Sequence, residues 1–529
     1  MKTPAYFKPW LAEWNLGGII ILFIILLSGV VQFAAFGLSQ TYVISYLGAQ
    51  PEDITFAIQL TYIAIIVILP VQFRFLRRFE IRDYLTINLF IGILLSIICM
   101  YTTNIMLFFI IRFFQGVIIC ISSGSILVLI PGFLKPEYRQ AVGPSVFYGT
   151  VLSASILIGI VAANVTLNAD FKTIYNYIII FQVIVLILIR LTLNAKSNIK
   201  PYPLYQIDWT GVVFFIAGAI AFAYTVIYGS KYYWFTDIRI KLSTLITIAA
   251  AIAYLYREAI VKRPHLDISV FKYKKFWIGL ILLAIYYGSK ESINIIFGYT
   301  ASILQWSPLQ VTMLGLSNIA GLLIFMVISA IILIHYKNTF MYFLIAGFSM
   351  LLLYQLWMYF IFTPDLAFDD LIVPLFFQGA ASGLLFVPIM VFTLSSIPVT
   401  AGVTGLAVAA FTRFTSLLNA GAGFYNLQLY YNQLYKESFL NHLTNIDEQT
   451  TERLNSFRQL FLSKGFSTEQ AVTAAYASLA KALGTQGQLL TNRATFMFVA
   501  IIIAFVLVLV ILAFIYQTYM KWKDVQLRN

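Results

Sequence analysis

The chain carries little charge for its length. Asp, Glu, Lys and Arg together make up only 10% of its 529 residues, whereas 61% are hydrophobic. A soluble domain normally has roughly 25% charged residues, because its surface faces water. This composition therefore excludes an ordinary soluble globular protein and indicates a chain that lies mostly in lipid.

Cysteine and histidine are also scarce. Cys99 and Cys120 both fall in apolar segments without a C-x-x-C pattern, so they indicate neither a disulfide framework nor a metal site. His265, His335 and His442 lie far apart, at or beyond the ends of apolar segments. A membrane-embedded enzyme would need clustered histidines, paired carboxylates or a nucleophile with its base, and no such group is apparent. We therefore expect no metal, no cofactor and no enzymatic activity.

Long apolar runs are abundant. A membrane-spanning helix needs about 20 mostly apolar residues, and backbone in lipid must satisfy its own hydrogen bonds. The runs are too continuous for the alternating strands of a membrane β-barrel. The sequence thus predicts an all-α integral membrane protein with fourteen spans, at about 17–38, 54–73, 83–102, 105–130, 140–164, 173–193, 209–228, 239–260, 275–300, 308–334, 339–361, 370–395, 401–428 and 494–517.

The basic residues predict the orientation. An even number of spans places both termini on one side of the membrane. Of the 34 Lys and Arg residues, 21 then fall on that same side: in the N-terminal segment, in the segments 74–82, 135–139, 190–200 and 257–275, at Lys337, and in the C-terminal segment after 520. Cytoplasmic segments are enriched in Lys and Arg. Both termini are therefore predicted to be cytoplasmic, and the net charge of +13 is explained by topology rather than by nucleic-acid binding.

The spacing of the segments predicts three regions. Residues 1–193 would form an N-terminal six-helix bundle, 194–274 an inserted helix pair with cytoplasmic linkers, and 275–529 a C-terminal six-helix bundle. The last region includes a long extracytoplasmic loop, 429–493. Within it, Ser467 to Gln470 has the pattern of a capping box, which predicts a helix from there to about Leu483 with Gly484 as its stop.

Ionisable residues inside spans are the main functional candidates, because each costs about 2.5 to 3.5 kcal/mol on insertion scales and usually faces a partner or a water-filled space. Arg112 and Gln115 are three residues apart and share a helix face, and Gly116 permits a close neighbour. Arg112 could anchor a polar network that is coupled to transport. It could also be a structural arginine.

Lys290 and Glu291 lie in the middle of a predicted span, with Asn294 one turn later. Adjacent residues are about 100° apart on a helix, so both side chains could border one cavity. Glu291 is the acidic residue placed deepest in a span, and it is our candidate proton carrier. The alternative is a structural ion pair.

Arg413 follows a run of small residues, so it could serve either the cavity or tight helix packing. The basic loop between the second and third spans is first a topology signal. Its second possible role is gating by salt bridges, through Arg74, Arg77, Arg78, Glu80 and Arg82.

Several short motifs, in order along nearly the whole chain, resemble the fourteen-span drug:proton antiporters of the major facilitator superfamily, the EmrB/QacA type. They are Arg112-x-x-Gln115-Gly116, Leu47-Gly48-Ala49, the run Gln378 to Leu384 with Pro388, and the run Gln486 to Leu490. In that family the span-4 arginine is implicated in proton coupling. The chain departs from the family in the loop between spans 2 and 3, where Phe73, Arg77 and Glu80 replace Gly, Asp and Gly, and in span 5, which has no proline from Ser145 to Lys200.

The resemblance implies a multi-pass transporter of the bacterial inner membrane that exports amphipathic or hydrophobic small molecules by alternating access, in antiport with protons. Related pumps work with a periplasmic adaptor and an outer-membrane channel, which loop 429–493 could meet. The alternatives are an exporter of one endogenous product, lipid-like or siderophore-like, with different or absent proton coupling, and a non-transporting membrane scaffold.

Overall fold

A computed structural model of the chain describes residues 6–12, 14–38, 40–130, 142–168, 171–196, 203–204, 207–261, 264–336, 339–398, 401–441, 443 and 448–526. These residues are almost entirely helical, with one isolated backbone bridge between Phe7 and Leu193. The α-helices are α1 (Pro9–Ala12), α2 (Asn15–Leu38), α3 (Gln40–Leu47), α4 (Pro51–Leu76), α5 (Ile81–Tyr101), α6 (Ile105–Leu129), α7 (Val142–Asn168), α8 (Phe171–Thr192), α9 (Trp209–Tyr228), α10 (Ile238–Ile260), α11 (Lys274–Lys290), α12 (Ile293–Ser302), α13 (Pro308–His335), α14 (Phe340–Ile361), α15 (Phe368–Ser395), α16 (Gly402–Leu440), α17 (Glu448–Ser463) and α18 (Thr468–Gln526).

Thirteen of the fourteen predicted segments each correspond to one of these helices. The segment 275–300 is divided between α11 and α12. Among the described residues, twelve segments are long and apolar enough to cross a membrane. The other two are α7, whose described apolar part is the shorter Gly149–Val165, and α16. Helix α16 falls short because polar residues such as Thr412, Arg413 and Asn419 interrupt it. The multi-pass helical class is confirmed, and the count of fourteen crossings stays a prediction.

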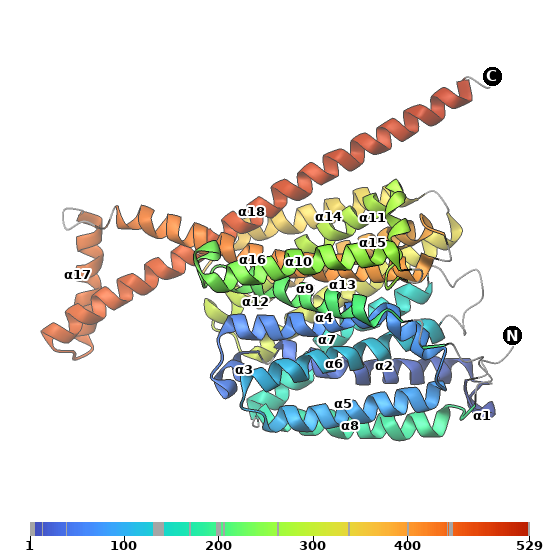
Figure 1. Cartoon of the computed structure of the whole chain (residues 1–529). Coiled ribbons are helices and arrows are strands. Elements are labelled where there is room, and N and C mark those ends of the chain that lie inside the picture. The colour runs from blue at the N-terminus through green and yellow to red at the C-terminus, as the bar shows by residue number, and fades with distance from the viewer. Residues whose placement is uncertain are drawn as a thin grey trace.

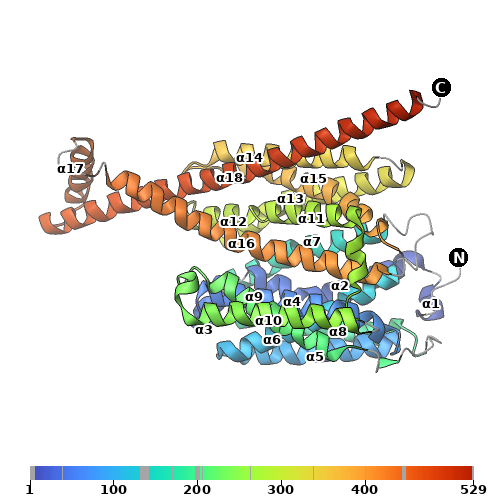
Figure 2. The same cartoon turned by 45° about the horizontal axis from the view of Figure 1, so that its top comes forward.

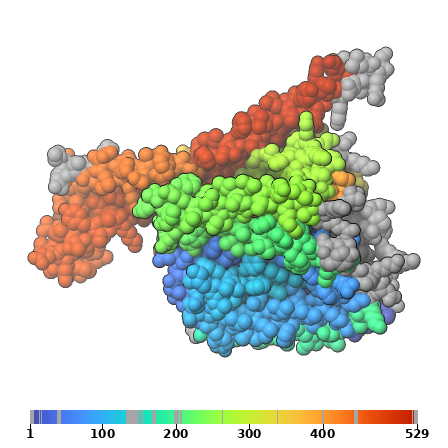
Figure 3. Space-filling model, viewed as in Figure 1, coloured from blue at the N-terminus to red at the C-terminus, as the bar shows by residue number. Residues whose placement is uncertain are grey.

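The helices run roughly parallel to one another and form an elongated body (Figure 1). Both ends of the chain lie at one end of this body, and α17 projects from the opposite end (Figures 1 and 2). The projection, which consists of the end of α16, α17 and the start of α18, stands clear of the body in the space-filling view (Figure 3). An even number of crossings gives this placement of the termini. Their cytoplasmic location remains a prediction, which rests partly on basic residues in 1–5, 262–263 and 527–529 that lie outside the described part.

The buried apolar residues form separate clusters along the chain. Two clusters use only residues between Phe7 and Leu193, and the largest uses only residues between Val270 and Val510. A fourth cluster joins α4 to the helix pair α9 and α10 and reaches Leu418 of α16. A small fifth cluster joins Leu69 of α4 and Cys120 of α6 to Ala407 of α16. The largest clusters thus divide the helices into two groups, which contact each other beside the cavity described below.

Two helix pairs approach closely because glycine provides the space. A Cβ atom at Gly116 of α6 would lie 2.4 Å from the Thr61 carbonyl oxygen of α4, so only glycine fits there. A Cβ at Gly379 of α15 would lie 2.0 Å from the Asn318 carbonyl oxygen of α13. The close neighbour predicted for Gly116 is therefore confirmed.

The described residues of the segment 429–493 are mostly helical and form the end of α16, all of α17 and the start of α18. The helix predicted to begin at Ser467 is present as the start of α18. The capping box is present, since the Gln470 amide donates to Ser467 Oγ at 3.3 Å and the Ser467 amide donates to Gln470 Oε1 at 3.2 Å. The predicted stop at Gly484 is wrong, because α18 continues to Gln526. Glycine costs only about 1 kcal/mol in a helix interior, and neither a proline nor a positive φ interrupts the chain there.

Candidate functional site: a central cavity between the two groups of helices

A cavity of about 280 Å³ lies where helices of the segment 15–168 meet helices of the segment 274–440. Its lining comes from α2, α4, α6 and α7 on one side and from α11, α12, α13, α15 and α16 on the other. Most of the lining is apolar. The charged residues of the described lining are Lys290, Glu291 and Arg413, which the sequence analysis selected as candidates.

The helix that carries Lys290 and Glu291 is interrupted at this point. Helix α11 ends at Lys290 and α12 begins at Ile293, with Glu291 and Ser292 between them. The sequence predicts one unbroken helical span over 275–300, and this prediction is wrong. The cause lies in two serine hydroxyls that bond to the backbone, from Ser289 to the Ile285 carbonyl at 2.7 Å and from Ser292 to the Ser289 carbonyl at 2.9 Å. Such bonds compete with the helical pattern.

Glutamines from two other helices satisfy the interrupted backbone. Gln355 of α14 donates to Ser292 Oγ at 2.9 Å and is fully buried. Gln378 of α15 donates to the Lys290 carbonyl at 3.3 Å, and its Oε1 accepts a hydrogen bond from Asn318 of α13. Buried polar groups without partners are costly, so these amides stabilise a geometry that the α11–α12 sequence alone would not hold. Discontinuous helices of this kind border the substrate and ion sites of many transporters.

Aromatic rings form the wall of the cavity and bridge its two sides. Tyr62 of α4 stacks on Phe414 of α16, with ring centroids 4.4 Å apart, and Phe33 of α2 lies 5.1 Å from Tyr62. The Arg413 guanidinium lies 5.0 Å from the Tyr287 ring and 5.2 Å from the Phe414 ring. Arg413 therefore belongs to the cavity wall.

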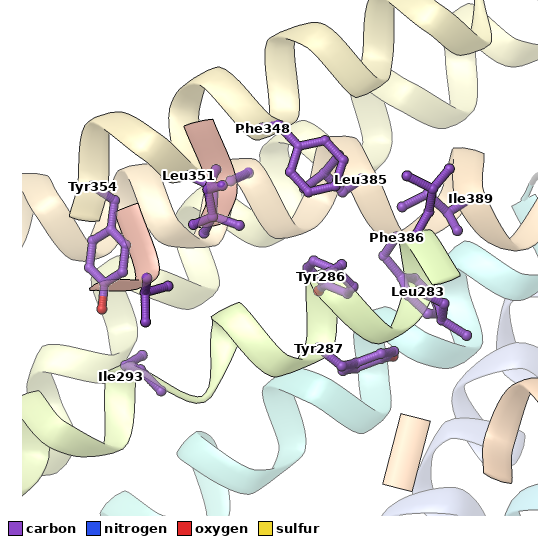
Figure 4. Close-up of a cluster of buried hydrophobic side chains, with 14 of the residues drawn as sticks. Leu283, Tyr286, Tyr287, Ile293, Phe348, Leu351, Tyr354, Leu385, Phe386 and Ile389 are labelled. Carbon is purple, nitrogen blue, oxygen red and sulfur yellow. The ribbon is translucent and has the colours of Figure 1, made fainter. Parts of the chain in front are cut away.

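Helix α11 separates this wall from the apolar core behind it. Figure 4 shows Tyr286 directed toward Phe348 and Leu385, while Tyr287 lies on the other side of the helix. Of these two tyrosines, Tyr287 lines the cavity. Tyr286 is fully buried in the core cluster.

Glu291 lies between the central cavity and a second one. The second cavity, of about 360 Å³, is lined by Glu291 and Asn294 together with residues of α16 and of α18, including Gln428 and Asn492. Asn294 donates a hydrogen bond to Glu291 Oε2 at 2.6 Å. One carboxylate thus borders both an apolar cavity and a more polar space at the base of the projection.

Arg112 and Gln115 lie apart from this lining. Arg112 is 1% exposed, donates to Gln115 Oε1 at 2.7 Å and has its guanidinium 4.0 Å from the Phe36 ring. The pairing expected from their spacing is confirmed. Neither residue lines the central cavity among the described residues, so a coupling role for them would act through Tyr62, which lies within electrostatic range of Arg112, Glu291 and Arg413.

The proposed gating residues divide into three environments. Arg74 donates to the Pro264 carbonyl at 3.3 Å, which ties α4 to the segment after α10. Arg82 and Arg190 both contact Asp83, at 3.4 and 3.3 Å, and join α5 to α8. Arg77 and Arg78 are exposed, and Glu80 is partly buried at the start of α5. A gating role stays a prediction.

The sequence analysis missed a second buried polar cluster, which joins the α9–α10 pair to α4. Arg257 of α10 forms a bidentate ion pair with Asp208, its Nε lying 2.8 and 3.0 Å from the two carboxylate oxygens. The carboxylate of Glu258 accepts hydrogen bonds from the His265 and Leu266 amides at 3.1 and 3.0 Å.

His265 connects this cluster to α4. Its Nε2 lies 3.0 Å from the Val67 carbonyl oxygen, and its Nδ1 lies 3.2 Å from the Tyr254 hydroxyl. Val67 lies three residues before Pro70, within α4. Burial lowers the pKa of His265, as does the nearby Arg74 cation, while its bond to the Val67 carbonyl and the Asp208 charge oppose the shift. Sequence could not reveal this role, because the Val67 carbonyl is 198 residues away along the chain.

The described residues contain no group of three or more His, Cys, Asp or Glu side chains that could hold a metal ion.

Comparison with known proteins indicates a transporter, as the central cavity does. No family model matches the chain. A probable multidrug resistance protein, EmrY of Escherichia coli, is 24% identical over 369 residues, which cover 67% of this chain and 68% of that protein. The multidrug export protein EmrB of Haemophilus influenzae is 24% identical over 460 residues, which cover 83% and 84%.

Solved structures agree on the fold. Two structures of POT family transporters, one with a thioalcohol-conjugated peptide and one with 5-aminolevulinic acid, superpose with TM-scores of 0.57 and 0.56 at 13% and 14% sequence identity. They cover 94% and 88% of this chain, and 96% and 95% of their own chains. The sequence relatives are named as multidrug resistance and export proteins, and the chain has many helices long and apolar enough to cross a membrane, so it is a multi-pass transporter. It has the fold of the major facilitator superfamily transporters and is a secondary transporter of the multidrug-efflux kind, similar to the EmrB and EmrY export proteins.

Proposed function

We propose that the chain exports amphipathic small molecules by alternating access, in antiport with protons. The observation that carries this proposal is the central cavity, which is mostly apolar, has three charged residues in its described lining, and lies between helices of the segments 15–168 and 274–440. In transporters built from two halves, substrate sites lie near the middle of the membrane, and the halves rock around the site. Residues 1–193 and 275–529 are the two halves in this proposal, with 194–274 as the inserted pair.

Glu291 is the proton carrier in the proposed cycle. A carboxylate that borders both cavities can exchange protons with the polar space on one side and respond to substrate on the other. Lys290 and Arg413 lie within electrostatic range of it, so a change in its protonation changes the charge of the whole cavity. Arg112 is a conformational partner in this cycle, linked to the cavity through Tyr62.

The second cavity is the exit route in the proposed cycle. Its residues come from α12 and from the places where α16 and α18 leave the body, and they include the amides of Gln428, Gln488 and Asn492 beside apolar side chains. Gln428 donates to Asn492 at 3.3 Å, and Gln488 donates to Ser302 at 3.1 Å. These uncharged contacts join α16, α18 and α12. They are weak enough to break and re-form during a transport cycle.

The projection is a docking site for a periplasmic adaptor, which would lead to an outer-membrane channel. It exposes large apolar side chains, including Leu440, Leu460 and Phe466, at 64%, 46% and 44%. Replacing 441–467 with a flexible linker leaves α16 and most of α18 in place. We expect such a variant to lose co-purification with an adaptor protein while retaining transport in vesicles. Equal co-purification of the parent and the variant would contradict this part of the proposal.

The coupling proposal is tested by measuring flux in proteoliposomes. Purified protein is reconstituted, an amphipathic fluorescent substrate is loaded, and a pH gradient is imposed in either direction. We expect the direction of net flux to reverse with the gradient, and Arg112→Ala to slow it. A flux that is independent of the gradient would support an exporter without proton coupling. No flux of any amphipathic compound would favour a non-transporting scaffold.

A further inference from the structure

The charge of the central cavity selects for one sign of substrate. Its described lining contains two basic side chains, Lys290 and Arg413, and one acidic side chain, Glu291. Among the described residues, no carboxylate lies within ion-pair distance of Lys290. Lys290 and Arg413 also lie within electrostatic range of each other. With all three groups ionised, the cavity carries one net positive charge in apolar surroundings.

The only acidic group of this lining is partly committed elsewhere. Glu291 accepts a hydrogen bond from Asn294, on the side of the second cavity. An uncompensated charge in a region of low dielectric is costly, and a ligand of opposite charge relieves that cost. A cationic ligand would add to the excess positive charge, whereas an anionic ligand would neutralise it.

The rest of the wall fits a flat apolar body. Phe33, Tyr62 and Phe414 form a continuous series of ring contacts on one side, and Tyr287 lies 6.1 Å from Phe386 on the other. Aromatic rings favour offset or edge contacts with a further ring. Arg413 lies between the two sets, next to both Tyr287 and Phe414.

We propose that the central cavity prefers amphipathic organic anions, with an aromatic body against these rings and a carboxylate or sulfonate on Lys290 and Arg413. The inference rests on the proposed function and narrows its substrate class. It assigns Lys290 and Arg413 to substrate recognition and leaves proton transfer to Glu291. Glu291→Gln therefore makes the cavity more positive and strengthens anion binding, even where coupling is lost.

The test compares ligands that share one ring system. The probes are 1-anilinonaphthalene-8-sulfonate, neutral N-phenyl-1-naphthylamine, and an anilinonaphthalene that carries a trimethylammonium group. Binding to the purified full-length protein is measured by calorimetry, and transport is measured in proteoliposomes. We expect the sulfonate to bind about tenfold more tightly than the neutral probe, and Lys290→Met and Arg413→Met each to remove most of this preference, since one charge lost at a few ångströms changes affinity on that scale.

Matched controls separate the cavity from general charge effects. Lys241→Met and Arg453→Met remove exposed basic residues outside the cavity and should leave the preference unchanged. Lys290→Arg should retain it, which guards against a variant that merely folds poorly. Equal or tighter binding of the neutral or cationic probe by the parent protein would overturn the inference.

The two proposals fail in different ways. Gradient-driven transport of the neutral or cationic probe without the sulfonate would refute the anion preference and keep the exporter. Absence of all transport would refute the exporter, while the binding series would still decide the preference of the cavity.

Discussion

The described residues contain two partly buried charged clusters that are built differently. At the α9–α10 junction, the Asp208 carboxylate pairs bidentately with Arg257, and both oxygens of Glu258 accept backbone hydrogen bonds. In the central cavity, the described side-chain hydrogen bond to Glu291 comes from Asn294, and Lys290 has no carboxylate within ion-pair distance among the described residues. A fully satisfied cluster holds one geometry, whereas a partly satisfied cluster can respond to a ligand or a proton. The junction is thus structural, and the cavity is the place where charge can change.

The largest loss of stability is expected at the junction. Asp208→Ala removes the partner of Arg257 and the acceptor of the Gly211 amide, and should lower the free energy of unfolding by about 2 to 3 kcal/mol, less than a fully buried pair would lose because Arg257 is partly exposed. Thermal unfolding in detergent measures the effect. Asp83→Ala, which breaks an exposed contact, is the control and should cost about 0 to 1 kcal/mol. Equal effects of the two substitutions would contradict the distinction.

A smaller loss of stability is expected when Gln355, which supports the interruption between α11 and α12, is replaced. Gln355→Leu leaves the Ser292 hydroxyl without its donor and should cost about 1 to 2 kcal/mol. Because Gln355 also holds the interruption before α12, this variant should transport more slowly at a temperature where it is still folded. Gln517→Leu, on an exposed face of α18, serves as the control. Unchanged flux in folded Gln355→Leu would show that the interruption does not need this support.

The pH dependence of stability should follow His265 at the junction. Burial lowers its pKa, so the unfolded chain takes up a proton at higher pH than the folded protein. The stabilisation is therefore present above the unfolded value of about 6.5 and decreases as the pH falls below it. Melting temperatures from pH 8 to 5.5 should fall more for the parent than for His265→Gln. Parallel curves would show that His265 does not contribute. The imidazole is surrounded by Tyr254, Glu258, Asp208 and Arg74. These four residues are left unchanged in both proteins.

The smallest effect on stability is expected for Lys290→Met in the cavity. Lys290 is partly buried and has no carboxylate within ion-pair distance among the described residues. Replacing such a charge by an apolar side chain of similar size is often close to neutral, so the change should stay within about 1 kcal/mol. The melting temperature in detergent measures it. A large loss of stability would place Lys290 with the structural charges and weaken its assignment to substrate recognition.

The sequence predicted the features that depend on neighbours along the chain. All fourteen apolar segments lie in helices, Arg112 bonds to Gln115 one turn later, and Gly116 lies against α4. The capping box at Ser467 is another local feature that was predicted.

Features that depend on distant partners were not predictable. The interruption at Glu291 needs Gln355 and Gln378 from two other helices, and the role of His265 needs the Val67 carbonyl. The position of Arg112 outside the cavity lining depends on how α2, α4 and α6 pack together. Sequence therefore identified the charged residues of the cavity and missed those of the junction, and the difference between the two sites emerged only from the three-dimensional structure.

The central claim is that Glu291 carries the coupled proton, and comparing net export with exchange tests it most directly. Exchange of labelled for unlabelled substrate across a vesicle membrane needs no proton cycle, whereas net export driven by a pH gradient does. We expect Glu291→Gln to lose gradient-driven export at least tenfold while it retains exchange, and the exposed control Glu452→Gln to retain both. Gradient-driven export that persists in Glu291→Gln with the parental pH dependence would contradict the account.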